Sequence, residues 1–386
     1  MDRYALVAGG LDINMLGRLW VDAKADPTIA PLAHQLLNLL NADPGTVFRR
    51  FGTLRGRKMR QRAQKEIGSG DADPEPASVP AQAKSHTWGT VSTIKTDADQ
   101  IAPFIAHHLS LGAAHMQIYL DAPLPRSAFD LLADPRVTLV NCDGDYWQAT
   151  GKPLMEKHQQ RQAFNATRAY RSAQTEWLAH IDCDEYLYSP NDVKDALRNA
   201  PATLEALIMP PAEELAQNAS EGPLLFRRTY FDAGCDKERL GELYPTFGDY
   251  LRSGFISHTA GKTIARTGMD DVRFGVHLLK RNGVEVKNTQ RVQTLNVLHR
   301  HAPDWATFQH HLEFRLSKGS YRDRGQSRLG LGDIIDILRE EHGSDGPKNL
   351  FTEVCTARSE VIKTLEVNGM LIRTRLLSQP IEATYA

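Results

Sequence analysis

The chain has 386 residues, of which 41% are hydrophobic, so it can bury a large core in one big domain with appendages or in two domains. Lys and Arg number 46 against 47 Asp and Glu. This balance excludes an overall electrostatic field that would recruit nucleic acid or a membrane, although local patches could still act.

The four cysteines are scattered without CxxC spacing, which argues against a structural zinc site or a disulfide framework and favours a reducing cytoplasm. The N-terminus lacks a charged start followed by a long apolar run, and no stretch approaches 18 consecutive apolar residues. We therefore expect no secretion signal and no transmembrane span, and a cytoplasmic protein.

The first 68 residues predict a small helical module, because leucines recur at helical spacing before Asp43-Pro44-Gly45. Residues 49–65 hold eight basic side chains. This run is either a solvated helix face or a peripheral contact with anionic lipid at the inner membrane face, a lipid-phosphate acceptor or a phosphorylated glycan. Residues 69–86 are rich in Pro, Ala, Ser and Asp and predict a linker.

Strands and helices alternate after the linker. The expected strands cover residues 88–95, 115–120, 136–143 and 177–182, and the expected helices lie around residues 101–109 and 158–173. This alternation predicts an α/β domain over residues 87–326, with a mostly parallel sheet and right-handed crossovers. Residues 327–386 show further helical periodicity and predict a helical C-terminal cap.

Three acids, Asp182, Asp184 and Glu185, follow the fourth predicted strand directly. Open parallel sheets bind ligands at the carboxyl ends of their strands. Carboxylates two residues apart can both face Mg²⁺ or Mn²⁺, which would offset their repulsion and stabilise a departing diphosphate. The plain alternative is a polar turn after a strand, because Asp-x-Asp is frequent by chance.

The segment "EWLAHIDCDEYLY" resembles the W-x-x-x-x-D-x-D-E-[FY]-L segment of bacterial glycosyltransferases related to family 2 and to family 92, which have the GT-A fold. Other segments resemble that family in the same order, among them "TIKTDADQIAPFIAHHLSLGAAHMQIYLD", "QQRQAFNATRAY", "SGFISHTAGKTIAR" and "FGVHLLKR". The likeness covers about residues 88–325. It implies a metal-dependent hexosyltransferase with a GT-A-type sheet and helical N-terminal and C-terminal extensions.

The resemblance implies that Asp182 and Asp184 hold Mn²⁺ or Mg²⁺ and the donor diphosphate. It also implies that Lys95 and Asp97 meet the nucleotide base and ribose, with Asp97 standing where the family often has Glu. Asp121 follows the second predicted strand and is a further candidate for nucleotide contact. Each could instead be an ordinary polar residue at a strand end.

Several basic residues are candidates for the same site. Arg161 could pair with phosphate or with the acids, and Lys262 could reach a phosphate past Gly261. A late histidine completes the metal shell in many GT-A enzymes, and His277, His299 and His301 are all candidates. Arg315, Lys318, Arg322 and Arg324 are either a basic flap over the diphosphate or a solvated charge run.

Transfer with inversion needs a carboxylate that takes the proton of the acceptor hydroxyl. Glu213 and Glu214 follow an apolar predicted strand and are the favoured candidates, with Asp249 as a third. Retention stays an alternative. The expected partners are a nucleotide-sugar donor, with UDP as the expected nucleotide, and a glycan, lipid or surface-polymer acceptor.

Two other functions compete. A non-catalytic nucleotide-sugar or glycan-binding protein could keep the same shell, although uncompensated carboxylates held together without a cation argue against it. A nucleotidyltransferase uses a similar sheet, but "TIKTDADQ" has no glycine-rich loop after the first predicted strand.

Overall fold

The computed structural model describes residues 86–376 except 218–221, 252, 318, 320 and 322–329, together with Thr28, Pro31 and Gln35. The predicted N-terminal module, the basic run and nearly all of the predicted linker lie outside the described residues. Contacts divide the chain into two compact units, residues 1–77 with 323–333 and residues 78–322 with 334–386. The second unit contains the site discussed below.

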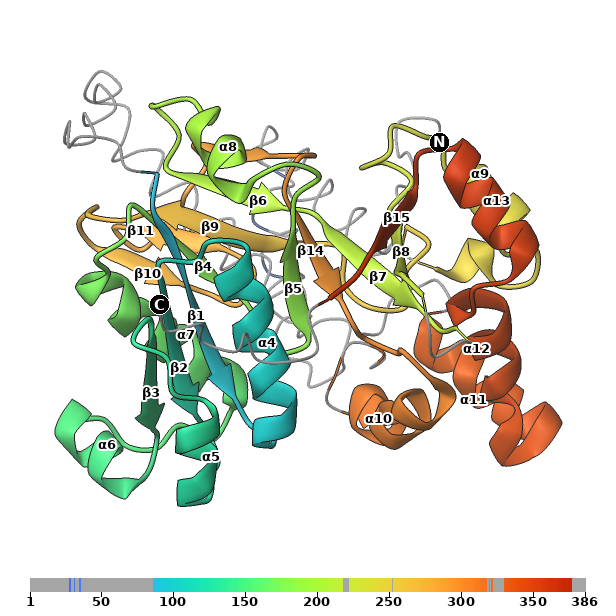
Figure 1. Ribbon diagram of the computed structural model, residues 1–386. Coiled ribbons are helices and arrows are strands. Elements are labelled where there is room, and N and C mark those ends of the chain that lie inside the picture. The colour runs from blue at the N-terminus through green and yellow to red at the C-terminus, as the bar shows by residue number, and fades with distance from the viewer. Residues whose placement is uncertain are drawn as a thin grey trace. The chain divides into compact units, whose positions relative to one another are not determined.

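The larger sheet of the second unit has seven strands among the described residues, in the order β13-β6-β9-β4-β1-β2-β3 (Figure 1). Strands β1 to β4 pair in parallel, and β9 alone runs antiparallel to both of its neighbours, β4 and β6. The strands are β1 (Trp88–Ile94), β2 (His115–Leu120), β3 (Val137–Asn141), β4 (Trp177–His180), β6 (Ala206–Met209), β9 (Lys262–Arg266) and β13 (Thr289–Arg291).

Helices cover both faces of this sheet (Figure 1). Side chains alternate along a strand, so Trp88 and Ile94 of β1 pack with Phe104 of helix α4 (Ala98–Ser110), whereas Val91 packs with Tyr170 of helix α7 (His158–Ser172) on the opposite face. Every residue of β1 is buried, including Thr90, Ser92 and Thr93, as expected for a central strand that is covered on both faces. The predicted α/β class, with a mostly parallel sheet flanked by helices, is confirmed.

A second sheet of five strands, counted over the described residues, has the order β15-β8-β7-β14-β5. Its strands are β5 (Glu185–Tyr188), β7 (Pro211–Leu215), β8 (Leu224–Arg228), β14 (Asn296–His299) and β15 (Leu371–Thr374). The alternation of the sequence did not predict this sheet. Strand β15 belongs to the segment expected to be a helical cap, and it pairs antiparallel with β8.

The described helices are α4 (Ala98–Ser110), α5 (Arg126–Leu131), α6 (Gly144–Thr150), α7 (His158–Ser172), α8 (Val193–Arg198), α9 (Arg239–Leu243), α10 (Trp305–Ser317), α11 (Leu331–His342), α12 (Pro347–Cys355) and α13 (Ser359–Val367), with short 3-10 helices η1 (Gly248–Tyr250) and η2 (Gly343–Asp345). A small sheet of β10 (Val272–Phe274), β11 (Leu279–Arg281) and β12 (Val284–Glu285) completes the unit. No helix in the described part of the chain is long and apolar enough to cross a membrane.

Two adjacent histidines join helix α4 to the second sheet. The Nε2 atom of His107 donates to the carbonyl of Leu187 in β5 at 2.8 Å, and the amide of Leu187 donates to Nε2 of His108 at 3.1 Å. Nδ1 of His108 donates to the carbonyl of Phe104 at 2.8 Å, so this imidazole is neutral. Complete burial lowers the pKa of His108 to about 3.

Candidate functional site

The acids lie at the point where the strand order of the larger sheet reverses. From β1 the chain builds β2 and β3 on one side, and it then returns to place β4 on the other side of β1. Open α/β sheets bind ligands outside the carboxyl ends of the strands at such a switch point. Asp182 follows the end of β4, and the exposed side chains of Lys95 and Asp97 follow the end of β1.

The acid turn, residues 182–185, carries the chain from β4 of the larger sheet to β5 of the second sheet. The amide of Asp182 donates to Oε2 of Glu185 at 2.8 Å, and the amide of Glu185 donates to the carbonyl of Asp182 at 3.1 Å. These reciprocal bonds close the turn. They direct the side chain of Glu185 into the protein interior, where it is almost completely buried, while the side chain of Asp184 stays about half exposed.

Lys262 is the counter-ion of the acid turn. It begins β9, is fully buried, and places Nζ 2.7 Å from Oδ2 of Asp182 and 3.2 Å from Oε2 of Glu185. Burial alone would lower the pKa of Lys262, but the two carboxylates outweigh it and raise that pKa above its ordinary value. The carboxylates are therefore already partly compensated, which removes the charge argument that the sequence offered against a non-catalytic protein.

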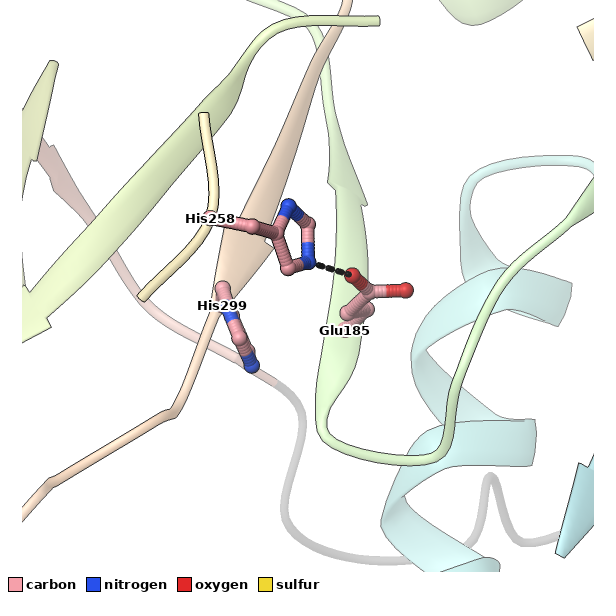
Figure 2. A group of neighbouring side chains, drawn as sticks. All are labelled: Glu185, His258 and His299. Carbon is pink, nitrogen blue, oxygen red and sulfur yellow. Dashed lines mark ion pairs between the residues drawn. The ribbon is translucent and has the colours of Figure 1, made fainter. Parts of the chain in front are cut away.

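Two histidines approach the same acids from separate elements (Figure 2). Nε2 of His258 lies 3.7 Å from Oε1 of Glu185, and Nε2 of His299, at the end of β14, lies 3.3 Å from Oδ2 of Asp184. One potential ligand atom each of Glu185, His258 and His299 lies within 4.8 Å of the others, the one such group among the described residues.

The polar atoms of this group are incompletely bonded. Oε1 of Glu185 is buried without a hydrogen-bond partner, and so is Nδ1 of both His258 and His299. Buried polar groups in folded proteins nearly always have a partner, so each exception requires an explanation. The Glu185 oxygen is the unpartnered atom that faces the group, because Nε2 of His258 points toward it and Nδ1 points away (Figure 2). One carboxylate oxygen and one nitrogen from each of two imidazoles, all within 4.8 Å of one another, fit a divalent transition metal such as Mn²⁺ better than Mg²⁺, which takes oxygen ligands.

The site has an excess of negative charge. The three acids of the turn face two cations, Lys262 and a protonated His299, which leaves one negative charge uncompensated. Burial acts to lower the pKa of His299, but the Asp184 carboxylate outweighs it and raises that pKa to about 9. Burial acts to raise the pKa of Asp184 and of Glu185, and the neighbouring histidines and Lys262 hold both below their ordinary values.

The other two candidate histidines make different contacts. Nδ1 of His277 donates to the carbonyl of Gly261 at 3.1 Å, its ring lies 4.1 Å from that of His258, and burial lowers its pKa to about 3. Nε2 of His301 bonds the hydroxyl of Tyr321 at 2.9 Å. Of the three candidates, His299 is the one that the structure places in the Glu185 group.

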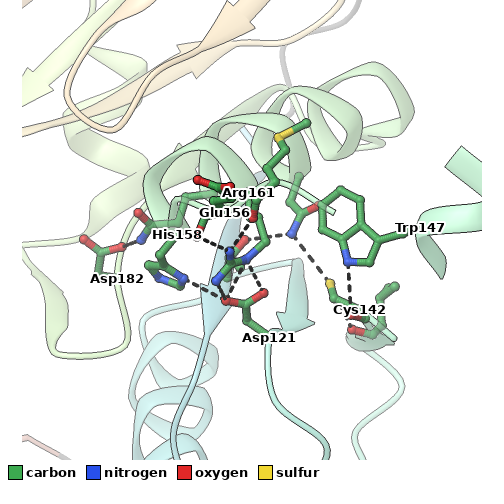
Figure 3. A network of polar contacts seen from close by, with 12 residues as sticks. Asp121, Cys142, Trp147, Glu156, His158, Arg161 and Asp182 are labelled. Carbon is green, nitrogen blue, oxygen red and sulfur yellow. Dashed lines mark hydrogen bonds and ion pairs between the residues drawn. The ribbon is translucent and has the colours of Figure 1, made fainter. Parts of the chain in front are cut away.

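Helix α7 connects the ends of β2 and β4 (Figure 3). Nε and Nη2 of Arg161 bond the two oxygens of Asp121 at 2.7 and 2.6 Å, and Nδ1 of His158 lies 2.8 Å from the same carboxylate. Gln162, the next residue of the helix, donates to Asp182. Asp121 and Arg161, which the sequence proposed as separate nucleotide contacts, are thus each other's partners.

Two of the three candidate bases lie within a strand rather than at a strand end. Glu213 and Glu214 are both buried in β7 and point to opposite faces. Glu213 pairs with buried Arg227, whereas Glu214 accepts from Nε of the partly exposed Arg300 at 2.8 Å.

Burial raises the pKa of Glu214, while Arg227 outweighs burial and lowers the pKa of Glu213. Asp249, the third candidate base, is exposed on η1. Arg315, which the sequence assigned either to a basic flap or to a solvated charge run, is buried and donates to the carbonyl of His301 at 2.7 Å, so neither assignment holds for it. Lys318, Arg322 and Arg324 lie outside the described residues.

Sequence reasoning missed His258 and gave Glu185 no role of its own. His258 lies in a segment quoted for its family likeness, but nothing in its spacing from the acids marks it as a neighbour of Glu185. The signal that existed was the third acid of the Asp182–Glu185 cluster. Gln162 and Arg227 could not be singled out, because their partners are distant in the sequence.

No family model matches the chain, and no curated protein matches it in sequence. Solved structures give low similarity. Glucosyl-3-phosphoglycerate synthase from Mycobacterium tuberculosis, in complex with Mn²⁺, UDP and glucosyl-3-phosphoglycerate, is 14% identical, with a TM-score of 0.32 over 66% of this chain and 88% of its own.

TarS from S. aureus is 12% identical, with a TM-score of 0.29 over 72% of this chain and 77% of its own. Core-mannan synthase A from Aspergillus fumigatus, in an Mn/GDP form, is 9% identical, with a TM-score of 0.25 over 51% of this chain and 67% of its own. At these values the chain is similar to each of them only in part.

Proposed function

We propose that the chain is a metal-dependent glycosyltransferase of the GT-A type, which moves a sugar from a nucleotide-sugar donor, UDP-linked, to a glycan, lipid or surface-polymer acceptor. One observation carries the proposal. Carboxylates and imidazoles converge at the carboxyl end of β4, at the switch point of an open α/β sheet, which is where such sheets bind nucleotides. The D-x-D-E segment supports it through its family resemblance.

The contacts of each side chain indicate which residues would bind the metal. Glu185, His258 and His299 form the group, and Asp184 adjoins it through His299. Asp182 and His277 serve less directly, because Lys262 and Gln162 bind Asp182 and Gly261 binds His277. When bound, Mn²⁺ would supply the positive charge that stabilises a departing diphosphate.

The remaining roles belong to the side chains around the metal. Lys95 and Asp97, exposed beyond β1, are in place to contact the base and ribose of the nucleotide. Lys262 holds Asp182 and Glu185 in position through ion pairs.

Glu214 is the better candidate base. Its raised pKa favours proton uptake near neutral pH, and Arg300, which donates to it, is partly exposed. Glu213 is already bonded to Arg227 and to two backbone amides.

Calorimetry tests the proposal directly. UDP is titrated into the protein with Mn²⁺, with Mg²⁺ and with a chelator, and we expect binding that requires the metal and is tighter with Mn²⁺. A panel of nucleotide sugars is then tested for metal-dependent hydrolysis by the wild type and by Asp184→Asn. Metal-dependent UDP binding without turnover of any donor would favour the non-catalytic protein, and indifference to both metal and UDP would overturn the proposal.

A further inference from the structure

One loop carries His258 to the site. Residues 256–261, here called the His258 loop, join the buried Phe255 to Lys262 at the start of β9. His258 is the member of the Glu185 group that lies on a loop, whereas Glu185 and His299 lie on strands (Figure 2). A ligand on a loop holds its position only if the backbone of that loop is held.

Glu213 holds the first part of the loop. Its Oε1 accepts from the amide of Ser257 at 2.8 Å, and its Oε2 accepts from the amide of Ile256 at 3.3 Å. The same carboxylate pairs with Arg227, and both side chains are almost completely buried. The ion pair with Arg227 therefore positions the Glu213 carboxylate, which in turn binds the amides of the two residues that precede His258.

Arg291 holds the second part of the His258 loop, as a donor to carbonyl groups rather than an acceptor from amides. Its guanidinium donates to the carbonyl of Ala260 at 3.1 Å and to that of Thr259 at 3.2 Å. Buried Asp232 orients it through bonds of 2.6 Å to Nε and 2.7 Å to Nη2. A carboxylate thus binds the amides before His258, and a guanidinium binds the carbonyls after it.

We infer that Glu213 and Arg291 are positioning residues that aim His258 at the candidate metal site, an inference that rests on the proposed function. It assigns Glu213 a task other than proton transfer. It also ties helix α12 to the site, because Arg227 donates to the carbonyl of Val354 near the end of that helix.

Mn²⁺ binding to the full chain, measured by calorimetry, tests this assignment. The variants are Glu213→Gln, Arg291→Lys, His258→Ala and the double variant of Glu213→Gln with His258→Ala. Residues that orient a metal ligand typically contribute about 10- to 100-fold to metal affinity, and we expect Glu213→Gln and Arg291→Lys each to weaken Mn²⁺ binding by about that factor. In the His258→Ala background, Glu213→Gln should have no further effect.

The matched control is Glu176→Gln. Glu176 also binds a buried arginine, Arg266 at 2.8 Å, and a backbone amide, that of His86 at 2.9 Å, but it precedes β4 at the other end of the sheet. We expect this control to leave Mn²⁺ affinity unchanged.

The outcomes separate the inference from the proposed function. If His258→Ala binds Mn²⁺ as tightly as the wild type, the metal site itself is misassigned. If His258→Ala weakens binding while Glu213→Gln and Arg291→Lys do not, the positioning role alone fails. An equal loss from Glu213→Gln with and without His258 would mean general destabilisation and would overturn the inference too. Should Glu213→Gln not fold, Arg291→Lys decides.

Discussion

Replacing Lys262 with methionine tests how the acid turn is balanced. Lys262 and Glu185 are fully or almost fully buried, whereas the side chain of Asp182 is 28% exposed. Removing one partner of a buried ion pair costs about 3–5 kcal/mol, since the other charge stays buried without compensation. Methionine keeps the apolar length of the side chain and water screens Asp182 in part, so we expect a loss of about 3 kcal/mol, the lower end of that range.

Mn²⁺ should reverse much of this loss. A ligand at 100 times its dissociation constant stabilises the folded state by about 2.7 kcal/mol. The Lys262→Met site carries one more uncompensated negative charge, so we expect it to bind Mn²⁺ more tightly than the wild type and to gain more stability from it.

Urea unfolding at neutral pH, with and without Mn²⁺, measures both effects. Lys280→Met is the control, because Lys280 is an exposed lysine on strand β11. Equal stability of Lys262→Met and the wild type would refute the assignment of Lys262 as the counter-ion. A gain from Mn²⁺ no larger than that of the wild type would refute the link between Lys262 and the metal site.

Three further changes follow from the structure. Gly261→Ala places a Cβ 2.4 Å from the carbonyl oxygen of Met209 at a φ of +79°, so we expect about 1–3 kcal/mol or more of lost stability in thermal unfolding; an unchanged melting temperature would contradict it. Asp184→Asn should weaken Mn²⁺ binding in calorimetry by at least about tenfold, and full affinity would remove Asp184 from the site. Between pH about 6.5 and about 3, His108 is protonated in the unfolded chain but stays neutral in the folded one, so this group alone should lower the free energy of unfolding by about 1.4 kcal/mol for each pH unit of acidification. Urea unfolding at several pH values should therefore show a weaker pH dependence for His108→Gln than for the wild type. An identical pH dependence would exclude His108 as the cause.

The larger sheet could be predicted because its signal is local. Strand β2 was predicted with its observed bounds, 115–120, and the other three early strands within two residues at either end, because short runs with large apolar residues alternate with helical periodicity along the chain. Helix α7, at 158–172, ends one residue before the predicted limit. In each case the residues that decide the structure are neighbours in the sequence.

The second sheet could not be predicted from local sequence patterns. In "MPPAEELAQ" two acids follow two prolines, a pattern typical of a strand end, yet Glu213 and Glu214 lie inside β7. They are buried there because Arg227 and Arg300 neutralise them, and Arg300 is 86 positions away from Glu214. Charge pairing over such separations leaves no periodic trace.

The candidate site shows the same division. The acid turn was recognisable because its three carboxylates are adjacent, and its place at the end of β4 followed from counting strands. His258 and Lys262 reach it from 73 and 77 positions beyond Glu185 in the sequence, and only the return of the antiparallel β9 to the side of β4 brings them there.

The histidine pair on α4 has a consequence for self-association. Strand β5 ends the second sheet, so its outer side offers backbone groups that another extended chain could use. His107 and His108 occupy both backbone groups of Leu187 on that side, and the amide of Glu185 is taken by the carbonyl of Asp182. The two imidazoles therefore keep these backbone groups from pairing with another extended chain. Acid that protonates Nε2 of His108 would free the Leu187 amide, whereas His107 keeps its bond because its Nε2 already donates.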